Sequence, residues 1–241
     1  ISKTLKSSHI SGMPLALSLE PTTACNLGCP ECPSGLKKFT RKTGNLTTSL
    51  NKKIIDELKH NLSYINYYFQ GEPYINPNFF EFISYANSKK IFCSTSTNGH
   101  FLNDSNCEKT IKSGLKRLII SIDGNDQKTY EEYRKNGEYK KVIKGTKNIL
   151  KWKKKLNSQF PHVIFQFLVV KTNEHLVNEM KELTASLGVD ELRIKTAQFY
   201  NFKNGNKLMP ENEKYNRYVK TKSGEYKLKN KMFNHCWRMW S

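Results

Sequence analysis

The chain lacks any apolar run long enough to span a membrane, because no segment approaches the ~20 consecutive apolar residues that a transmembrane helix requires. Near its start, the apolar stretch Met13–Leu19 is too short for a secretory signal peptide and runs directly into Glu20. The sequence therefore predicts a soluble, cytoplasmic protein with no membrane partner. Its 241 residues, 37% of them hydrophobic, suffice for one globular domain or for one domain with an appended segment.

Acidic residues are few: 21 Asp and Glu stand against 40 Lys and Arg, which gives a formal net charge of +19. Such a charge raises the question of nucleic acid, since phosphate-binding proteins present a basic face. The lysines, however, are spread along the whole chain, and the one dense run, Lys151–Lys155, falls in a helical pattern whose solvated face explains it. No RNA-binding signature accompanies them. Nucleic acid is thus an unfavoured partner, and RNA stays only as an alternative substrate.

The sequence also lacks the G-x-G-x-x-G turn of a dinucleotide-binding domain, although it does alternate between strand and helix patterns. Strands that alternate with helices predict βαβ units around a parallel sheet buried on both faces. Small polar residues follow each predicted strand, which favours a β/α barrel, where the chemistry lies at the strand ends. The predicted strands are 15–20, 64–69, 91–96, 117–123, 162–170 and 191–196.

Helical patterns separate these strands. Residues 50–62 carry one apolar face, formed by Leu50, Ile54, Ile55, Leu58 and Leu62. A second pattern spans residues 176–187, with Gly188 placed to end it, and residues 126–156 predict two helices interrupted near Gly137.

The sequence has no second cysteine pair at metal-ligand spacing, although "ACNLGCPECPSG" puts Cys25, Cys29 and Cys32 on one short segment. Without secretory marks, these cysteines are more typical of metal ligands than of disulfides. Thiolates select zinc, copper(I) or iron–sulfur clusters, and structural zinc normally needs two ligand pairs. A 4Fe-4S cluster usually takes four cysteines, so three would leave one iron open. A zinc-stabilised binding module remains an alternative, and Cys93 and Cys107 are predicted to be packing residues.

This C-x3-C-x2-C spacing after the first predicted strand resembles the radical S-adenosylmethionine (radical SAM) enzymes. The resemblance implies a partial (β/α)6 barrel over residues 1–200, in which Cys25, Cys29 and Cys32 hold a 4Fe-4S cluster. S-adenosyl-L-methionine would chelate the fourth iron. It further implies reductive cleavage of that cofactor to a 5′-deoxyadenosyl radical, which abstracts hydrogen from a substrate, and a small electron-donor protein of the flavodoxin or ferredoxin type.

Further segments are similar to family motifs at successive strand ends. "FQGEP" (69–73) resembles a Gly-Gly-Glu motif at the methionine amine, with Gln70 in place of the first Gly, and "TSTNGHFL" (95–102) resembles the strand at the ribose. "ISIDG" (120–124) with a downstream arginine resembles the groups at the cofactor carboxylate, and "VVKTN" (169–173) the strand end near the adenine. The residues that the resemblance assigns to the cofactor are Gly71, Glu72, Thr97, Asn98, Ser121, Asp123 and Arg134.

The segment "HCWRMWS" (235–241) is similar to the start of a SPASM or twitch extension. This implies that residues 201–241 are a linker and the beginning of that extension, cut short at Ser241, with Cys236 as the first ligand of an auxiliary iron–sulfur cluster. Members of that branch modify peptides, proteins or small molecules. We therefore expect a maturase-like radical SAM oxidoreductase with a peptide or small-molecule substrate. The sequence assigns no catalytic acid or base, and radical modification of RNA is the alternative reaction.

Overall fold

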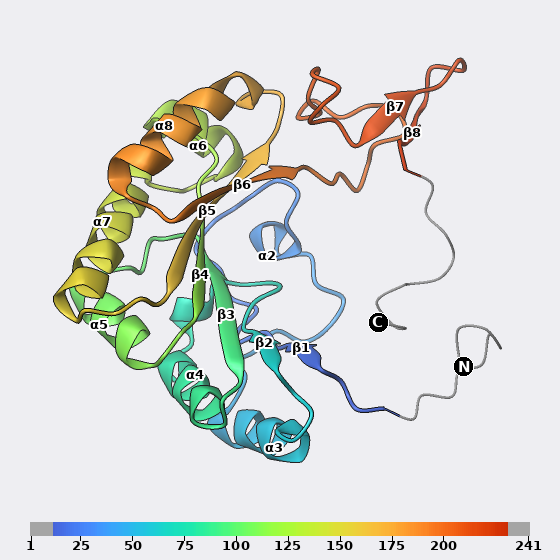
Figure 1. Cartoon of the computed structure of the whole chain (residues 1–241). Coiled ribbons are helices and arrows are strands. Elements are labelled where there is room, and N and C mark those ends of the chain that lie inside the picture. Colours follow the sequence, from blue (N-terminus) through green and yellow to red (C-terminus); the bar gives the residue numbers. More distant parts are fainter. Residues whose placement is uncertain (1–11, 231–241) are drawn as a thin grey trace.

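A curved sheet of six parallel strands organises the molecule, whose computed structural model describes residues 12–230 (Figure 1). Neighbours in the sheet are also neighbours in the chain, in the order β1-β2-β3-β4-β5-β6, so every connection is a βαβ crossover of the predicted kind. The strands are β1 (Ala16–Ser18), β2 (Tyr64–Asn66), β3 (Phe92–Thr97), β4 (Arg117–Ser121), β5 (His162–Val169) and β6 (Glu191–Thr196). Each overlaps one predicted strand, and the architecture is the expected partial (β/α)6 barrel.

The helices between the strands gather mainly on the outer side of the sheet, with α3, α4, α5, α7 and α8 forming one layer (Figure 1). The short helix α2 lies apart from them, near the strand ends where the cysteines are. The helices are α2 (Pro33–Leu36), α3 (Thr48–Leu58), α4 (Phe79–Ser88), α5 (Asp104–Lys112), α6 (Gln127–Tyr133), α7 (Tyr139–Lys155) and α8 (Val177–Leu187), with the 3-10 turns η1 (Pro73–Ile75) and η2 (Glu174–Leu176).

The main hydrophobic core lies between the sheet and the helix layer. Alternate residues of β5, such as Val163, Phe165 and Phe167, are fully buried in it. Cys93 and Cys107 are both fully buried members of this core, as packing residues should be. Because the strands are covered by helices on this side, their apolar alternation fixes which residues face the other, concave side.

The break between two helices and the end of a third fall where the sequence predicts them. α6 and α7 are separated around Gly137, and α8 ends at Gly188, whose φ of +74° suits glycine. The predicted apolar face of α3 is wrong at one position, because Leu50 is 49% exposed. Asn51 takes the inward position there, and its Oδ1 accepts a 2.8 Å hydrogen bond from the buried Tyr67 hydroxyl.

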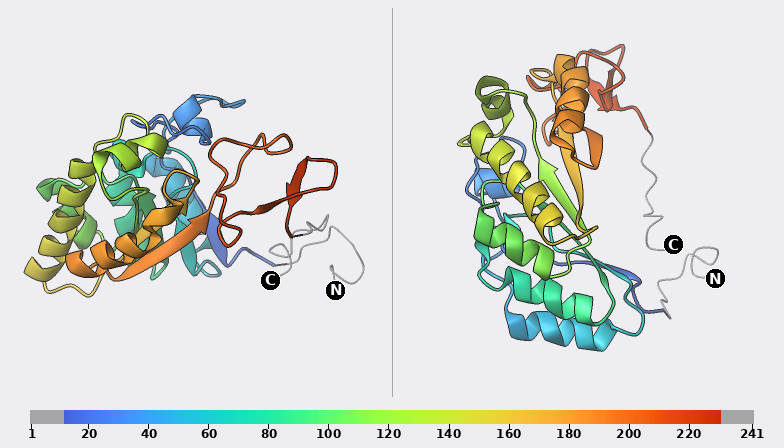
Figure 2. Two further views of the ribbon diagram at one scale, coloured as in Figure 1. Left: turned by 90° about the horizontal axis from the view of Figure 1, so that it is seen from above. Right: turned by 60° about the vertical axis from the view of Figure 1, so that its left-hand side comes forward.

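A second, smaller core lies beyond the edge of the barrel. There, residues 197–209 and the antiparallel hairpin β7 (Tyr218–Lys220) and β8 (Tyr226–Leu228) follow β6 (Figures 1 and 2). Phe199, Met209 and Tyr218 join Leu27 and Cys29 in one buried cluster. The segment after the barrel thus packs directly on the cysteine loop. No helix within residues 12–230 combines the length and the hydropathy needed to cross a bilayer.

Candidate active site

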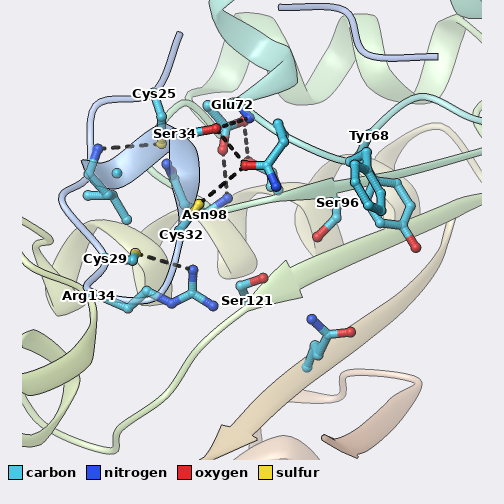
Figure 3. A pocket seen from close by; sticks show the side chains of 17 residues that line it. Cys25, Cys29, Cys32, Ser34, Tyr68, Glu72, Ser96, Asn98, Ser121 and Arg134 are labelled. Atoms are coloured by element: carbon cyan, nitrogen blue, oxygen red, sulfur yellow. Dashed lines mark hydrogen bonds between the residues drawn. The ribbon is translucent and has the colours of Figure 1, made fainter. Parts of the chain in front are cut away.

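Three thiols border one cavity of about 240 Å³ at the carboxyl ends of the strands (Figure 3). They belong to the loop that follows β1 and leads into α2, whose N-terminal cap is Cys32. The Cys32 N–H donates to the Cys29 carbonyl oxygen over 3.2 Å, which holds these two cysteines in a turn. Cys25, Cys29 and Cys32 are all free thiols. The loop therefore presents three soft sulfur donors to one space.

Each thiol has a different polar neighbour. The Leu27 N–H points to Cys25 Sγ at 3.5 Å, Cys32 Sγ lies 3.5 Å from the Gln70 side-chain oxygen, and Arg134 Nη1 lies 3.7 Å from Cys29 Sγ. Burial raises the pKa of Cys25 to about 11. Burial likewise raises the pKa of Cys29, against the opposing charge of Arg134. Both thiols are therefore protonated near neutral pH until a metal displaces the proton.

The donor set fits an iron–sulfur cluster. The thiolates of a single zinc ion lie within about 4 Å of one another, given Zn–S bonds of ~2.3 Å. Within residues 12–230, no three His, Cys, Asp or Glu side chains are arranged to hold one ion. In a cluster, each cysteine thiolate binds a separate iron, so donors spread around a shared cavity suit it. Three donors leave one iron without a protein ligand.

A glycine allows the loop after β2 to approach the cysteine loop. Gly71 has φ +76°, and a Cβ there would lie 2.0 Å from the Thr22 carbonyl oxygen, so no other residue fits. The next N–H, that of Glu72, donates to the Ala24 carbonyl oxygen over 2.7 Å. The Ser34 hydroxyl donates to the Gln70 side-chain oxygen at 2.8 Å and accepts from the Gly71 N–H at 2.8 Å. These bonds fix the "QGE" segment against α2.

The Glu72 carboxylate organises the end of β3. Its Oε1 accepts from the Thr97 hydroxyl at 2.7 Å and from the Tyr74 N–H at 3.3 Å, and its Oε2 accepts from the Asn98 N–H at 2.7 Å. The residue is only 2% exposed. Burial raises the pKa of Glu72 to about 7, even though these hydrogen bonds favour the charged form. Asn98 in turn donates from Nδ2 to the Asn26 side-chain oxygen, back in the cysteine loop.

A buried ion pair lies beneath the second cysteine. Arg134, at the end of α6, donates from Nε to Asp123 Oδ2 at 2.5 Å, and the other Asp123 oxygen accepts from the Leu168 N–H at 2.7 Å. The carboxylate of Asp123 raises the pKa of Arg134 further above its usual value, against the effect of burial. The guanidinium is thus a fixed positive charge that faces both Asp123 and Cys29.

Most of the residues assigned to the cofactor from the sequence border the thiol cavity: Gly71, Glu72, Thr97, Asn98, Ser121 and Arg134. Asp123 does not border it, because this carboxylate is fully buried behind Arg134. Residues 169–173 do not border it either, and Asn173 instead donates to the Asp123 carbonyl oxygen. Cys236 lies outside the described residues.

Other residues that border the cavity had been assigned no role from the sequence. Ser34 and Gln70 border the cavity and are joined to each other by a hydrogen bond. Tyr68 and Ser96 border it as well. Gln166 pairs with Ser121 in the parallel register of β4 and β5, so strand alternation places both on one face. That alternation is the only signal in the sequence that could have identified Gln166.

Comparison with known proteins identifies the family. Residues 19–157, which contain all three cysteines and all seven assigned cofactor residues, match the model of the radical SAM superfamily. The chain belongs to this superfamily. Enzymes of this superfamily use a 4Fe-4S cluster and S-adenosylmethionine, and the match therefore favours an iron–sulfur cluster over a zinc-stabilised module at the three cysteines.

Two curated relatives and one solved structure illustrate the radical SAM match. The chain is 29% identical over 180 residues to an AdoMet-dependent heme synthase of Methanosarcina barkeri, covering 74% of this chain and 49% of that protein. It is 26% identical over 204 residues to a PqqA peptide cyclase of Rhodopseudomonas palustris, covering 83% and 52%. Streptococcus suis SuiB bound to precursor peptide SuiA shares the fold at a TM-score of 0.66 and 18% identity, covering 87% and 45%. The chain spans about half the length of the curated relatives it matches.

Proposed function

We propose that Cys25, Cys29 and Cys32 bind a 4Fe-4S cluster whose open iron takes S-adenosylmethionine, and that the protein cleaves this cofactor reductively to act on a peptide substrate. One observation carries the proposal: three thiols, with no fourth from residues 12–230, border the same cavity as six residues of the family's cofactor motifs. When bound, the cluster supplies the electron that splits the sulfonium into methionine and a 5′-deoxyadenosyl radical, which takes a hydrogen atom from the substrate.

The chain's own residues bind and orient the two groups. Arg134 provides a buried positive charge beside Cys29, where it offsets the negative charge of a thiolate and can pair with the cofactor carboxylate. Glu72 fixes Thr97 and Asn98 at the end of β3 and offers a buried carboxylate to the cofactor amine. Asp123 positions Arg134, and Ser121 adds a hydroxyl to the same cavity.

The peptide part of the proposal is supported by the names of relatives. A PqqA peptide cyclase aligns along 83% of this chain, and the SuiB structure of the same fold holds a precursor peptide. We infer a maturase-like activity, and that residues 201–241 begin a SPASM-type extension in which Cys236 binds an auxiliary cluster. Residues 197–228 support this division, because they leave the sheet after β6 and form their own hairpin.

The proposal predicts specific iron and product yields. After anaerobic reconstitution, we expect the Cys25→Ala/Cys29→Ala/Cys32→Ala variant to lose about four iron and four sulfide per chain relative to the parent. Under dithionite, the parent should convert S-adenosylmethionine to 5′-deoxyadenosine, and the variant should not. Iron and sulfide assays and chromatography measure both. A Cys93→Ala/Cys107→Ala variant, with two buried core thiols removed, controls for nonspecific loss of cysteine.

Stoichiometric zinc without sulfide in the parent would contradict the cluster, whatever the product assay shows. A peptide substrate is tested separately, by the crosslinks or mass changes that the reconstituted protein introduces into peptides encoded beside its gene. Turnover of RNA and not of peptide would overturn that part alone.

A further inference from the structure

His100 follows the end of β3 and is partly buried, but it does not border the thiol cavity. Its backbone N–H donates to Asn98 Oδ1 at 3.1 Å, and its ring Nδ1 lies 3.1 Å from the same oxygen and 3.2 Å from the Asn98 carbonyl oxygen. On the other side of the ring, the N–H of Glu138, the N-terminal cap of α7, donates to Nε2 at 2.8 Å. The Tyr130 ring of α6 stacks on the imidazole.

The hydrogen bond from Glu138 fixes the tautomer of the His100 ring. A nitrogen that accepts a hydrogen bond carries no proton, so Nδ1 carries the proton of the neutral imidazole and donates to Asn98. Burial lowers the pKa of His100, against the hydrogen bond with Asn98 and the charge of Glu138, and the charges of Lys141 and Arg134 lower it as well. The ring is therefore neutral near pH 7, with a fixed donor toward Asn98.

This donor orients the Asn98 side chain at the cavity (Figure 3). The amide oxygen faces His100, and the amide nitrogen Nδ2 donates to Asn26 Oδ1 at 2.7 Å, next to Cys25 in the cysteine loop. An amide nitrogen has two hydrogens, and among the residues that the structure describes Asn26 is its only acceptor. The second hydrogen is thus left for a group bound in the cavity, whereas a rotated amide would set its oxygen against that of Asn26.

We propose that His100 is a positioning residue for the cofactor: it holds the Asn98 amide so that Nδ2 faces both the cysteine loop and an oxygen of S-adenosylmethionine. This rests on the proposed function, since Asn98 must contact the cofactor. Glu72 fixes only the backbone of Asn98, whose N–H donates to Oε2 at 2.7 Å. The hydrogen bonds run from the start of α7 through His100 and Asn98 to Asn26, and so join three segments around the cavity.

Two substitutions separate the two ring nitrogens, because an asparagine amide reaches the position of Nδ1 and a glutamine amide that of Nε2. His100→Asn keeps a donor for Asn98 and loses the acceptor for Glu138, and His100→Gln does the reverse. By anaerobic calorimetry on cluster-loaded protein, the dissociation constant of S-adenosylmethionine should rise at least about ten-fold in His100→Gln and stay within about three-fold in His100→Asn. Hydrogen exchange of the Glu138 amide in cluster-free protein should quicken only in His100→Asn.

A histidine that merely anchors α7 would give the reverse order of affinities, with the cofactor lost from His100→Asn, and that result would overturn the proposal. A double-mutant cycle tests the route through Asn98. In an Asn98→Ala background, His100→Gln should change the dissociation constant less than about two-fold, because the amide that the histidine orients is absent. Additive losses would also overturn it. His60→Asn, at an exposed position after α3, is the control and should bind the cofactor like the parent.

The cluster-free protein provides a readout that does not depend on the cofactor. In ¹⁵N NMR spectra near neutral pH, one imidazole should carry its proton on Nδ1, and this signal should be missing from His100→Asn. A His100 ring protonated on Nε2 would overturn the proposal, because Nδ1 would then have no proton to donate to Asn98. If the cluster-loaded parent binds no S-adenosylmethionine, the proposed function fails, and the ring spectrum still decides whether His100 orients Asn98.

Discussion

At the scale of single residues, Glu72 is a carboxylate that is buried and yet borders the cavity of the three thiols. Three donors hold its carboxylate, and they come from β3, the turn after it and η1. Hydrogen bonds to the charged form normally lower the pKa of a carboxyl group, but full burial outweighs them here and the pKa is about 7. This residue of the thiol cavity thus carries a stability cost when it is ionised.

This cost predicts a pH dependence of folding. Because the folded-state pKa of about 7 lies above the ordinary 4.5, the folded protein holds this proton more tightly than the unfolded chain. The Glu72 carboxyl group therefore adds to the free energy of unfolding below about pH 4.5. This contribution, about 3 kcal/mol, is lost as the pH rises to about 7. We expect the free energy of unfolding of cluster-free parent, minus that of Glu72→Gln, to fall by that order between pH 5 and 7.5 in urea titrations. A difference that is constant with pH would contradict this.

At the scale of elements, the cysteine loop and the start of α2 are attached to two other segments of the chain. Ser34 in α2 ties them to the segment after β2, and Glu31 ties them to the segment after β6. Glu31 does not border the cofactor cavity. Its carboxylate accepts from the Tyr200 N–H at 3.2 Å and from Asn206 Nδ2 at 3.0 Å, which are more than 160 residues away in the chain. The loop position between the second and third cysteines therefore serves attachment.

Removal of this attachment should loosen both partners. In Glu31→Ala we expect a loss of about 1–2 kcal/mol in the free energy of unfolding, because two hydrogen bonds to a charged acceptor disappear. Hydrogen exchange should quicken in residues 25–32 and 199–206 together, and not in β4 or β5. Glu57→Ala, at an exposed position of α3, is the control and should change neither quantity. Faster exchange in only one of the two segments would show that they are not coupled through Glu31.

At the scale of the whole molecule, the chain forms two hydrophobic cores, a larger one and a smaller one. The main core lies between the sheet and the outer helices, and the second joins the cysteine loop to residues 197–228. The second core crosses the boundary at residue 200 that we propose for the barrel. Tyr218 is 2% exposed in it, and its hydroxyl accepts from the Phe199 N–H at 2.8 Å. The segment after β6 therefore helps to support the cysteine loop.

Adjacent residues of β7 provide a test of this support. Tyr218→Ala should lower the free energy of unfolding by about 3–5 kcal/mol, the range for removing a large buried side chain. Val219→Ala, at a position 39% exposed, should cost less than about 1 kcal/mol. Iron retained after reconstitution should also fall in the first variant and not in the second. Equal effects of the two substitutions would mean that the hairpin does not support the loop.

Much of the barrel was predictable because its signals are local. Apolar strands with helical patterns between them, Gly188 and the interruption near Gly137 each depend on a few neighbouring residues, and the structure has all of them. The prediction that Leu50 lies on the buried face of α3 was wrong because it, too, used only a local pattern. A local apolar pattern cannot anticipate that the Tyr67 hydroxyl, from another element, draws Asn51 into the core.

The sequence by itself determined the three thiols, their spacing and the order of the polar motifs at the strand ends, since these are properties of short segments. Tertiary structure alone decided that Asp123 lies behind Arg134, that Ser34 and Gln70 close the cavity wall, and that Glu31 faces the segment after β6. It also placed Cys25 beside a second cavity, which residues 22–25 border together with residues of the segment 34–45. These contacts join residues from about ten to nearly 180 positions apart, and only the packing of the folded chain brings such residues within hydrogen-bond distance.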